Sequence, residues 1–164
     1  MKTMREIIKV GVVGCGYWGP NLIRNLGQSP DCQLKAICDT SEQRLGHMRR
    51  LHPEVATTNR FEDLLNDKEI DAVVIATPVR FHYDMAKACL KAGKHAFIEK
   101  PMARTVAEGE ELVALAERQS LVLMVGHTFL FSPAVRRFPT TCLSPDQRLG
   151  ARKRWVEKKP RKRS

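Results

Sequence analysis

The 164-residue sequence has no run of apolar residues that approaches the length needed to cross a membrane. Near the N-terminus, Glu6 and Lys9 interrupt the apolar core that a secretion signal would require. These absences argue against an integral membrane protein and against an exported one. We therefore predict a soluble protein that is located in the cytoplasm.

The sequence also lacks the spacings that indicate a disulfide framework or a metal site. Its five cysteines are an odd number, and no two of them form a C-x-x-C pair. The zinc-binding pattern H-E-x-x-H is absent as well. We expect reduced thiols, as in a cytosolic protein, and we predict no metal site.

One glycine-rich stretch organises the chain. Gly14-Cys15-Gly16-Tyr17-Trp18-Gly19 has the spacing G-x-G-x-x-G, between a β-branched run at 7–13 and an amphipathic segment that begins near Pro20. We predict a strand, a turn and a helix, in which the helix's free amides and positive end face a dinucleotide's pyrophosphate. Gly14 would allow the tight turn, Gly16 the approach of the pyrophosphate, and Gly19 the close packing of helix on strand. The alternative is a glycine-rich turn that binds nothing.

A carboxylate stands where such a loop requires one. Asp39 follows a predicted strand at 33–38 and lies 20 residues beyond Gly19, where it can accept hydrogen bonds from the adenosine ribose. It should also repel the 2′-phosphate of NADP, since like charges about 4 Å apart cost roughly 4 kcal/mol at an effective dielectric of about 20. We therefore expect NAD to be favoured over NADP. The alternative role for Asp39 is a helix cap or a turn residue.

Strands and helices alternate through the rest of the folded part. We predict further strands near Val55 and at 71–76, 95–98 and 121–125, with helices between them. One helix, after Thr77-Pro78, places an apolar face toward the sheet. That face consists of Phe81, Met85, Ala88, Cys89 and Ala92. The alternation specifies right-handed βαβ crossovers and hence an α/β, Rossmann-type, doubly wound parallel sheet.

Polar residues follow the predicted strands directly. The carboxyl ends of parallel strands meet at one edge of a sheet, and open α/β sheets bind ligands at that edge. The stretches that meet there are the glycine loop, Asp39, Thr77-Pro78, Glu99-Lys100-Pro101 and Gly126-His127.

These stretches resemble the N-terminal domain of the Gfo/Idh/MocA oxidoreductases, which are named after glucose-fructose oxidoreductase and inositol dehydrogenase. The resemblance covers about residues 5 to 137. It rests on the glycine loop with Tyr17-Trp18-Gly19-Pro20-Asn21, Asp39, Ala76-Thr77-Pro78 followed by His82, and above all Glu99-Lys100-Pro101. The loop and Gly126-His127-Thr128-Phe129 are most similar to the branch that acts on nucleotide sugars. The resemblance implies hydride transfer between a nicotinamide cofactor and a sugar hydroxyl.

The resemblance also implies roles for individual residues. It places Lys100 on the nicotinamide ribose and the reacting hydroxyl, Glu99 on the ribose side, and a cis bond before Pro101. The alternative is a Glu-Lys pair on a solvated turn. His82 is equally well explained as a core or capping histidine, whereas the position of His127 favours the site. The candidate cofactor-binding residues are Gly14, Gly16, Tyr17, Trp18, Gly19, Asp39, Thr77, Pro78, His82, Glu99, Lys100, Pro101 and His127, and Lys100 is the candidate catalytic residue.

The pattern changes near Ser132. Residues 132–164 hold 11 Lys and Arg against 2 acidic residues, and four prolines interrupt them. We predict an NAD(P)-binding domain at 1–137 and a basic, disordered tail at 138–164. Family members continue into a second domain that forms the substrate pocket, so a truncated or frameshifted gene product is one hypothesis. Such a chain should bind cofactor more readily than it turns over a substrate.

The alternative function is a non-catalytic dinucleotide-binding module whose basic tail contacts nucleic acid or another polyanion. Against it, the residues before Ser132 are nearly neutral, and the tail offers only Trp155 for stacking on bases. We therefore expect a dinucleotide as the partner, with a sugar or nucleotide sugar if a substrate domain is supplied. We expect neither a membrane nor nucleic acid as a partner.

Overall fold

The computed structural model describes residues 7–127. The chain divides into two units at Gly126 and His127, and apart from His127 the second unit lies outside the described residues. The predicted boundary at 137 and the predicted disorder of the tail also fall there. No helix among residues 7–127 is long and apolar enough to span a membrane.

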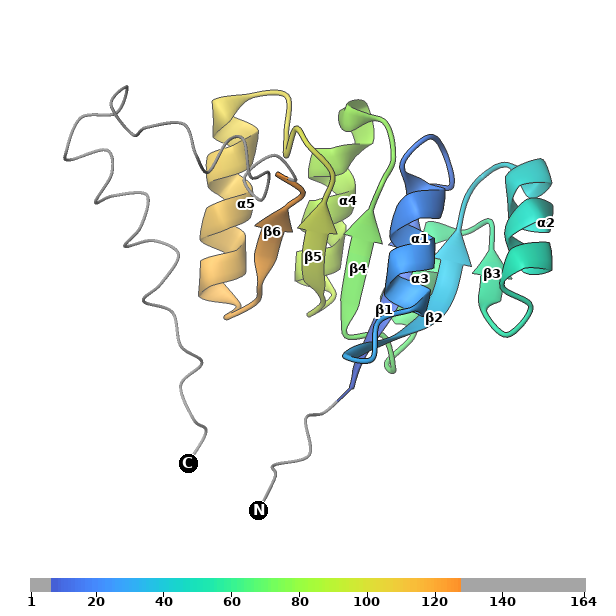
Figure 1. Cartoon of the computed structure of the whole chain (residues 1–164). Coiled ribbons are helices and arrows are strands. Elements are labelled where there is room, and N and C mark those ends of the chain that lie inside the picture. Colours follow the sequence, from blue (N-terminus) through green and yellow to red (C-terminus); the bar gives the residue numbers. More distant parts are fainter. Residues whose placement is uncertain (1–6, 128–164) are drawn as a thin grey trace, which may run out of the picture. The chain divides into compact units, whose positions relative to one another are not determined.

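Six parallel strands form one sheet in the order β3-β2-β1-β4-β5-β6 (Figure 1). The strands are β1 (Ile8–Val13), β2 (Cys32–Cys38), β3 (Ala56–Thr58), β4 (Ala72–Ile75), β5 (His95–Ile98) and β6 (Leu123–Val125). The chain winds outward from β1 in one direction and then from β4 in the other, which is the Rossmann arrangement. The predicted fold class is therefore confirmed.

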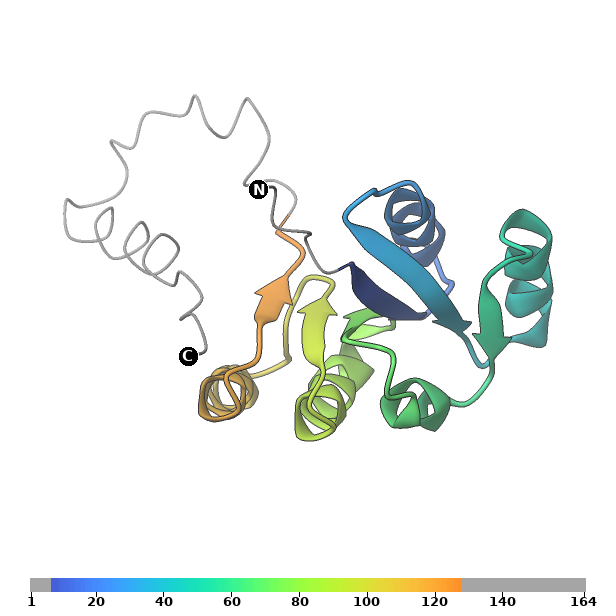
Figure 2. The same ribbon diagram turned by 90° about the horizontal axis from the view of Figure 1, so that it is seen from below.

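Helices cover the sheet on both sides. They are α1 (Gly19–Gly27), α2 (Glu42–Leu51), α3 (Phe61–Asn66), α4 (His82–Lys91) and α5 (Val106–Arg118), with a short 3-10 turn η1 (Val79–Phe81) before α4. Figure 2 shows α1 on one face of the sheet and α3, α4 and α5 on the other. Because each crossover returns the chain to the same end of the sheet, all six strands end at one edge.

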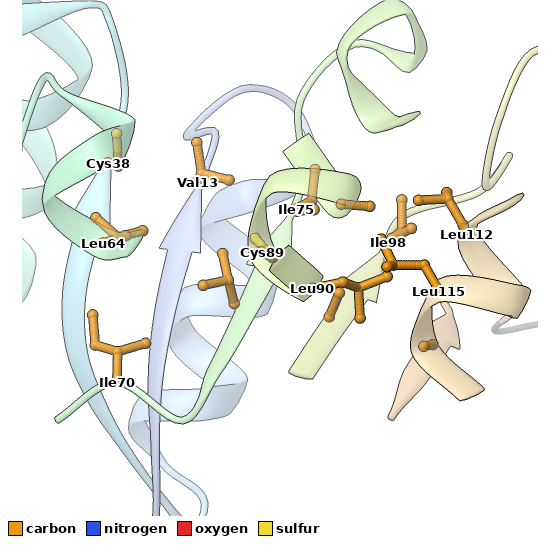
Figure 3. Close-up of a cluster of buried hydrophobic side chains, with 14 of the residues drawn as sticks. Val13, Cys38, Leu64, Ile70, Ile75, Cys89, Leu90, Ile98, Leu112 and Leu115 are labelled. Carbon is orange, nitrogen blue, oxygen red and sulfur yellow. The ribbon is translucent and has the colours of Figure 1, made fainter. Parts of the chain in front are cut away.

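Two clusters of buried side chains hold these layers together. Ile23 of α1 and Leu45 of α2 pack with Ile37 of β2 in one cluster. In the other, Leu90 of α4 and Leu112 of α5 lie against the strands (Figure 3). The central strands are buried on both faces, which is why they appear in the sequence as continuous apolar runs rather than as alternating patterns.

The predicted apolar face of α4 is confirmed for Cys89, which is in the core, and for Met85, which packs against it, but is wrong for Phe81 and Ala92, which are exposed. The buried residues of the helix are His82, Ala86, Cys89 and Leu90. Phe81 is 41 % exposed and, with Met85, lines the cavity described below. The turn η1 precedes the helix and displaces its start, so the apolar residues of the sequence divide between the core and the cavity.

A capping box begins helix α5. The Thr105 hydroxyl accepts a hydrogen bond from the Glu108 amide, and the Glu108 carboxylate accepts one from the Thr105 amide. These two bonds satisfy amides that the first turn of a helix otherwise leaves free.

We expect truncation of a buried and of an exposed leucine to have different effects on the free energy of unfolding. Leu90 is fully buried, whereas Leu51, at the end of α2, is 57 % exposed. Leu90→Ala should lower the free energy of unfolding by about 2–5 kcal/mol, because it leaves a cavity. The matched control Leu51→Ala should change it by less than about 0.5 kcal/mol. Urea denaturation followed by circular dichroism measures both, and equal losses would contradict this packing.

Candidate functional site

A cavity of about 730 Å³ opens where the strands end. Its size is suited to a small ligand, since such sites have volumes of roughly 300–1,000 Å³. Its walls come from the segments that follow β1 to β5, together with η1 and residues of α2, α3 and α4. The predicted site residues among its walls are Gly14, Gly16, Tyr17, Trp18, Asp39, Thr77, Pro78, Glu99 and Lys100.

A side chain would have different consequences at the three glycines of the loop. Gly14 has a φ of +99°, and a Cβ there would lie 2.6 Å from the Ala76 carbonyl oxygen. A Cβ on Gly19 would lie 2.0 Å from the Gly14 carbonyl oxygen. Both glycines therefore serve the packing of the loop itself.

Gly16 differs, because a Cβ there would meet no atom within 4 Å, yet the residue lines the cavity. The protein's own packing thus gives no reason for a glycine at this position. The open space beside its backbone is a cradle that fits the pyrophosphate of a dinucleotide. The helix α1 begins at the same wall, and among residues 7–127 no side chain caps its first amides.

Asp39 joins the glycine loop to the start of α2. Its carboxylate accepts hydrogen bonds from the Cys15 amide at 2.6 Å and from the Ser41 amide at 2.8 Å. The Arg44 guanidinium lies 3.6 Å from the same carboxylate and also lines the cavity. Asp39 is 6 % exposed, so its oxygens are available to a ligand only from the cavity side.

Cys15 is not a reactive thiol, although it lies just before a helix. Burial, and secondarily the Asp39 carboxylate, raise the pKa of the Cys15 thiol to about 12. The thiol therefore stays protonated at neutral pH and is a poor nucleophile.

The segment after β5 presents a cation to the cavity. The Lys100-Pro101 bond is cis, as the resemblance implied. Glu99 is buried and accepts a hydrogen bond from the Lys100 amide at 3.3 Å. Lys100 is exposed and lines the cavity, and within the described part of the chain no carboxylate forms an ion pair with its ammonium.

Four predicted site residues are not among the residues that line the cavity. Gly19 is buried in the first turn of α1, and His82 is 1 % exposed. Pro101 is exposed and its carbonyl contacts the His82 ring. His127 is exposed and belongs to the second unit.

The sequence did not single out several residues that line the cavity. These are Thr40, Arg44, Asn59, Phe61, Arg80, Phe81 and Met85. Phe81 and Met85 were assigned to the core because they are apolar. Arg44 looks like an ordinary basic residue on the surface of a helix, and its one signal is that it stands shortly after Asp39. Among residues 7–127, no cluster of His, Cys, Asp and Glu could hold a metal ion.

The model of the Gfo/Idh/MocA family, described as the NAD-binding Rossmann fold of an oxidoreductase family, matches residues 8–127. The chain therefore belongs to this family, and the described residues form its NAD(P)-binding domain. The predicted family is confirmed.

Among curated relatives, the chain is 31 % identical over 137 residues to the "Uncharacterized oxidoreductase YrbE" of Bacillus subtilis, covering 84 % of this chain and 40 % of the relative. It is 36 % identical over 122 residues to an "Alpha-N-acetylgalactosaminidase" of Shewanella oneidensis, covering 69 % of this chain and 27 % of the relative. The chain thus spans well under half the length of these relatives.

Two solved structures show the same domain with different ligands. A scyllo-inositol dehydrogenase from Lactobacillus casei, bound to NAD(H) and scyllo-inositol, has 26 % identity and a TM-score of 0.74, over 80 % of this chain and 39 % of that one. A biliverdin reductase from Synechocystis, bound to biliverdin and NADP+, has 32 % identity and a TM-score of 0.74, over 79 % and 40 %.

Because a side chain at Gly16 would enter open space in the cavity, we expect a substitution there to weaken cofactor binding while the fold is kept. Gly16→Val should leave the melting temperature nearly unchanged, because a Cβ meets no atom there within 4 Å. It should weaken NADH binding by roughly tenfold or more, since added methyl groups in a fitted site cost about 1–3 kcal/mol.

Gly46→Val is the matched control, because Gly46 lies within α2 and its Cβ would also meet nothing within 4 Å. It should leave NADH affinity unchanged. Calorimetric titration and thermal melting of both variants test this. Equal NADH affinity of the Gly16 variant and the wild type would argue against pyrophosphate binding at this loop.

Proposed function

We propose that residues 7–127 hold NAD for an oxidoreductase that acts on a hydroxyl group of a sugar or nucleotide sugar. The observation that carries this proposal is the convergence on one cavity of a glycine with open space, a carboxylate, and a lysine that forms no ion pair within residues 7–127. A bound nicotinamide would supply hydride chemistry. The chain's own residues would bind it, orient it and present a proton donor beside it.

Asp39 would hold the adenosine ribose. A carboxylate has about four lone-pair positions, and the Cys15 and Ser41 amides occupy two of them. The remaining positions can accept hydrogen bonds from ribose hydroxyls. Because the same carboxylate fixes the glycine loop, ribose and pyrophosphate would be bound by one rigid unit.

Lys100 would act on the substrate oxygen. Its ammonium can donate a hydrogen bond to a hydroxyl or carbonyl oxygen in the cavity and take part in moving a proton there. The buried Glu99 would lie on the ribose side and accept hydrogen bonds from that sugar. These roles follow from the family's pattern and from the position of both residues in the cavity wall.

A carbohydrate substrate is supported by two of the similar proteins. The names of the Lactobacillus dehydrogenase and of the Shewanella relative refer to a cyclic polyol and to an amino sugar. The biliverdin reductase has the same domain and a different substrate, so the domain alone does not determine the substrate. The cytoplasmic location and the alternative role of the basic segment in binding nucleic acid stay predictions.

The choice between NAD and NADP depends on two opposite charges. Asp39 disfavours a 2′-phosphate, whereas Arg44, 3.6 Å away, attracts one. The buried carboxylate is less screened than the guanidinium, whose side chain is 57 % exposed. We therefore propose that the repulsion by Asp39 prevails and that NAD is the cofactor.

Titration of the whole chain with NAD and NADP tests this choice. NAD should bind about tenfold more tightly, because even a third of a repulsion of roughly 4 kcal/mol produces that ratio. Arg44→Ala should widen the ratio by a few-fold, since it removes the cation that attracts the phosphate. The control Arg50→Ala, on an exposed residue of the same helix, should leave it unchanged. Tighter binding of NADP by the wild type would contradict the assignment.

A further inference from the structure

Four residues of the cavity wall have no role in the binding of ribose, pyrophosphate or substrate oxygen that is proposed for the other residues. They are Phe61 of α3, Arg80 and Phe81 of η1, and Met85 of α4. Three of them are apolar, and two of these are aromatic. Apolar and aromatic walls take up the apolar, planar part of a ligand, whereas the few polar groups of a site fix its orientation.

The guanidinium of Arg80 lies over the aromatic ring of Phe81. Its Cζ is 4.7 Å from the ring centroid, which is the geometry of a cation–π contact. Arg80 belongs to none of the ion pairs among residues 7–127. The ring therefore restrains the guanidinium, and no carboxylate in that range competes with it. Because both residues are exposed and line the cavity, the pair is accessible to a ligand.

Contacts between neighbouring loops place these residues beside the proposed cofactor site. The Asp39 amide donates a hydrogen bond to the Thr58 carbonyl at 3.2 Å, so the segment that leads to Phe61 adjoins Asp39. A Cβ on Gly14 would lie 2.6 Å from the Ala76 carbonyl oxygen, so the segment that leads to η1 adjoins the glycine loop. Because α3 and α4 lie on the same face of the sheet (Figure 2), Phe61 and η1 bound the cavity on that face.

An adenine base has the shape and chemistry that this wall can bind. The base is attached directly to the ribose that Asp39 is proposed to hold, it is planar, and it has a π face without a charge. A guanidinium is planar and stacks on π faces, so one that already lies over a ring offers its opposite face to a second planar group. A phosphate, by contrast, would use only the charge and the N–H groups of the guanidinium.

We propose that Arg80, held over Phe81, stacks on the adenine ring of the cofactor and thereby favours a dinucleotide over nicotinamide mononucleotide. Phe81 is a positioning residue, because it keeps the guanidinium in place before the base arrives. The proposal rests on the proposed function, since it takes Asp39 to hold the adenosine ribose. It assigns a role in binding to two residues that the sequence did not place in the site.

Titration of the whole chain with NADH and with reduced nicotinamide mononucleotide, which lacks the adenosine, tests the role of Arg80. Arg80→Ala should weaken NADH binding by roughly fivefold to tenfold and leave mononucleotide binding unchanged. Arg80→Lys should bind NADH as weakly as Arg80→Ala, because an ammonium keeps the charge but has no plane to stack. The control Arg118→Ala, on an exposed residue of α5, should change neither affinity. Wild-type NADH affinity of Arg80→Lys would overturn the stacking in favour of a phosphate contact, and an equal loss for both ligands would overturn it as well.

Phe81→Leu tests the positioning of the guanidinium. It should weaken NADH binding by roughly threefold in the wild type and have no further effect in Arg80→Ala, since the ring acts through Arg80. Equal losses in both backgrounds would overturn the positioning role. All these variants should keep the wild-type melting temperature, because the altered side chains are exposed. Wild-type NADH binding that Arg80→Ala leaves intact would refute the stacking alone, whereas absence of NADH binding by the wild type would refute the proposed function and the stacking with it.

Discussion

The hydrogen bond between the Cys15 amide and the Asp39 carboxylate fixes the glycine loop against the end of β2. The Gly14 amide adds a second bond, to the Cys38 carbonyl, at 2.8 Å. Because Gly14 also lies against Ala76 and Gly19 against Gly14, the loop is held on three sides. The cavity wall, the start of α1 and the open space at Gly16 all depend on this arrangement.

The polar residues at the end of the sheet have two kinds of role. Lys100 is exposed in the cavity wall and is available to a ligand. His82 is buried behind that wall, and its ring lies between the Thr77 and Pro101 carbonyls. Asp39 has both roles, since it supports the loop and lines the cavity. A site built in this way keeps its shape before a cofactor arrives, which reduces the ordering that binding requires.

The fold was predictable from the sequence because parallel strands buried on both faces form continuous apolar runs, and because the residues after each strand share one edge. The division of the apolar residues near the start of α4 was not predictable, since Phe81 lines the cavity and Met85 both packs against the core and lines the cavity. Arg44 and His82 could not be assigned from spacing alone. Their roles depend on contacts with Asp39 and Pro101, which lie far from them in the chain or on other elements.

The central claim is that this domain holds a dinucleotide against the loop that contains Trp18. Trp18 lines the cavity, and Trp155 is the other tryptophan of the chain. A Trp155→Phe protein therefore reports on the loop alone through its fluorescence. Addition of NADH should quench Trp18 emission saturably with one molecule bound per chain, and NAD should reverse the quenching by competition. Fluorescence that shows no saturable change with NADH would contradict the account.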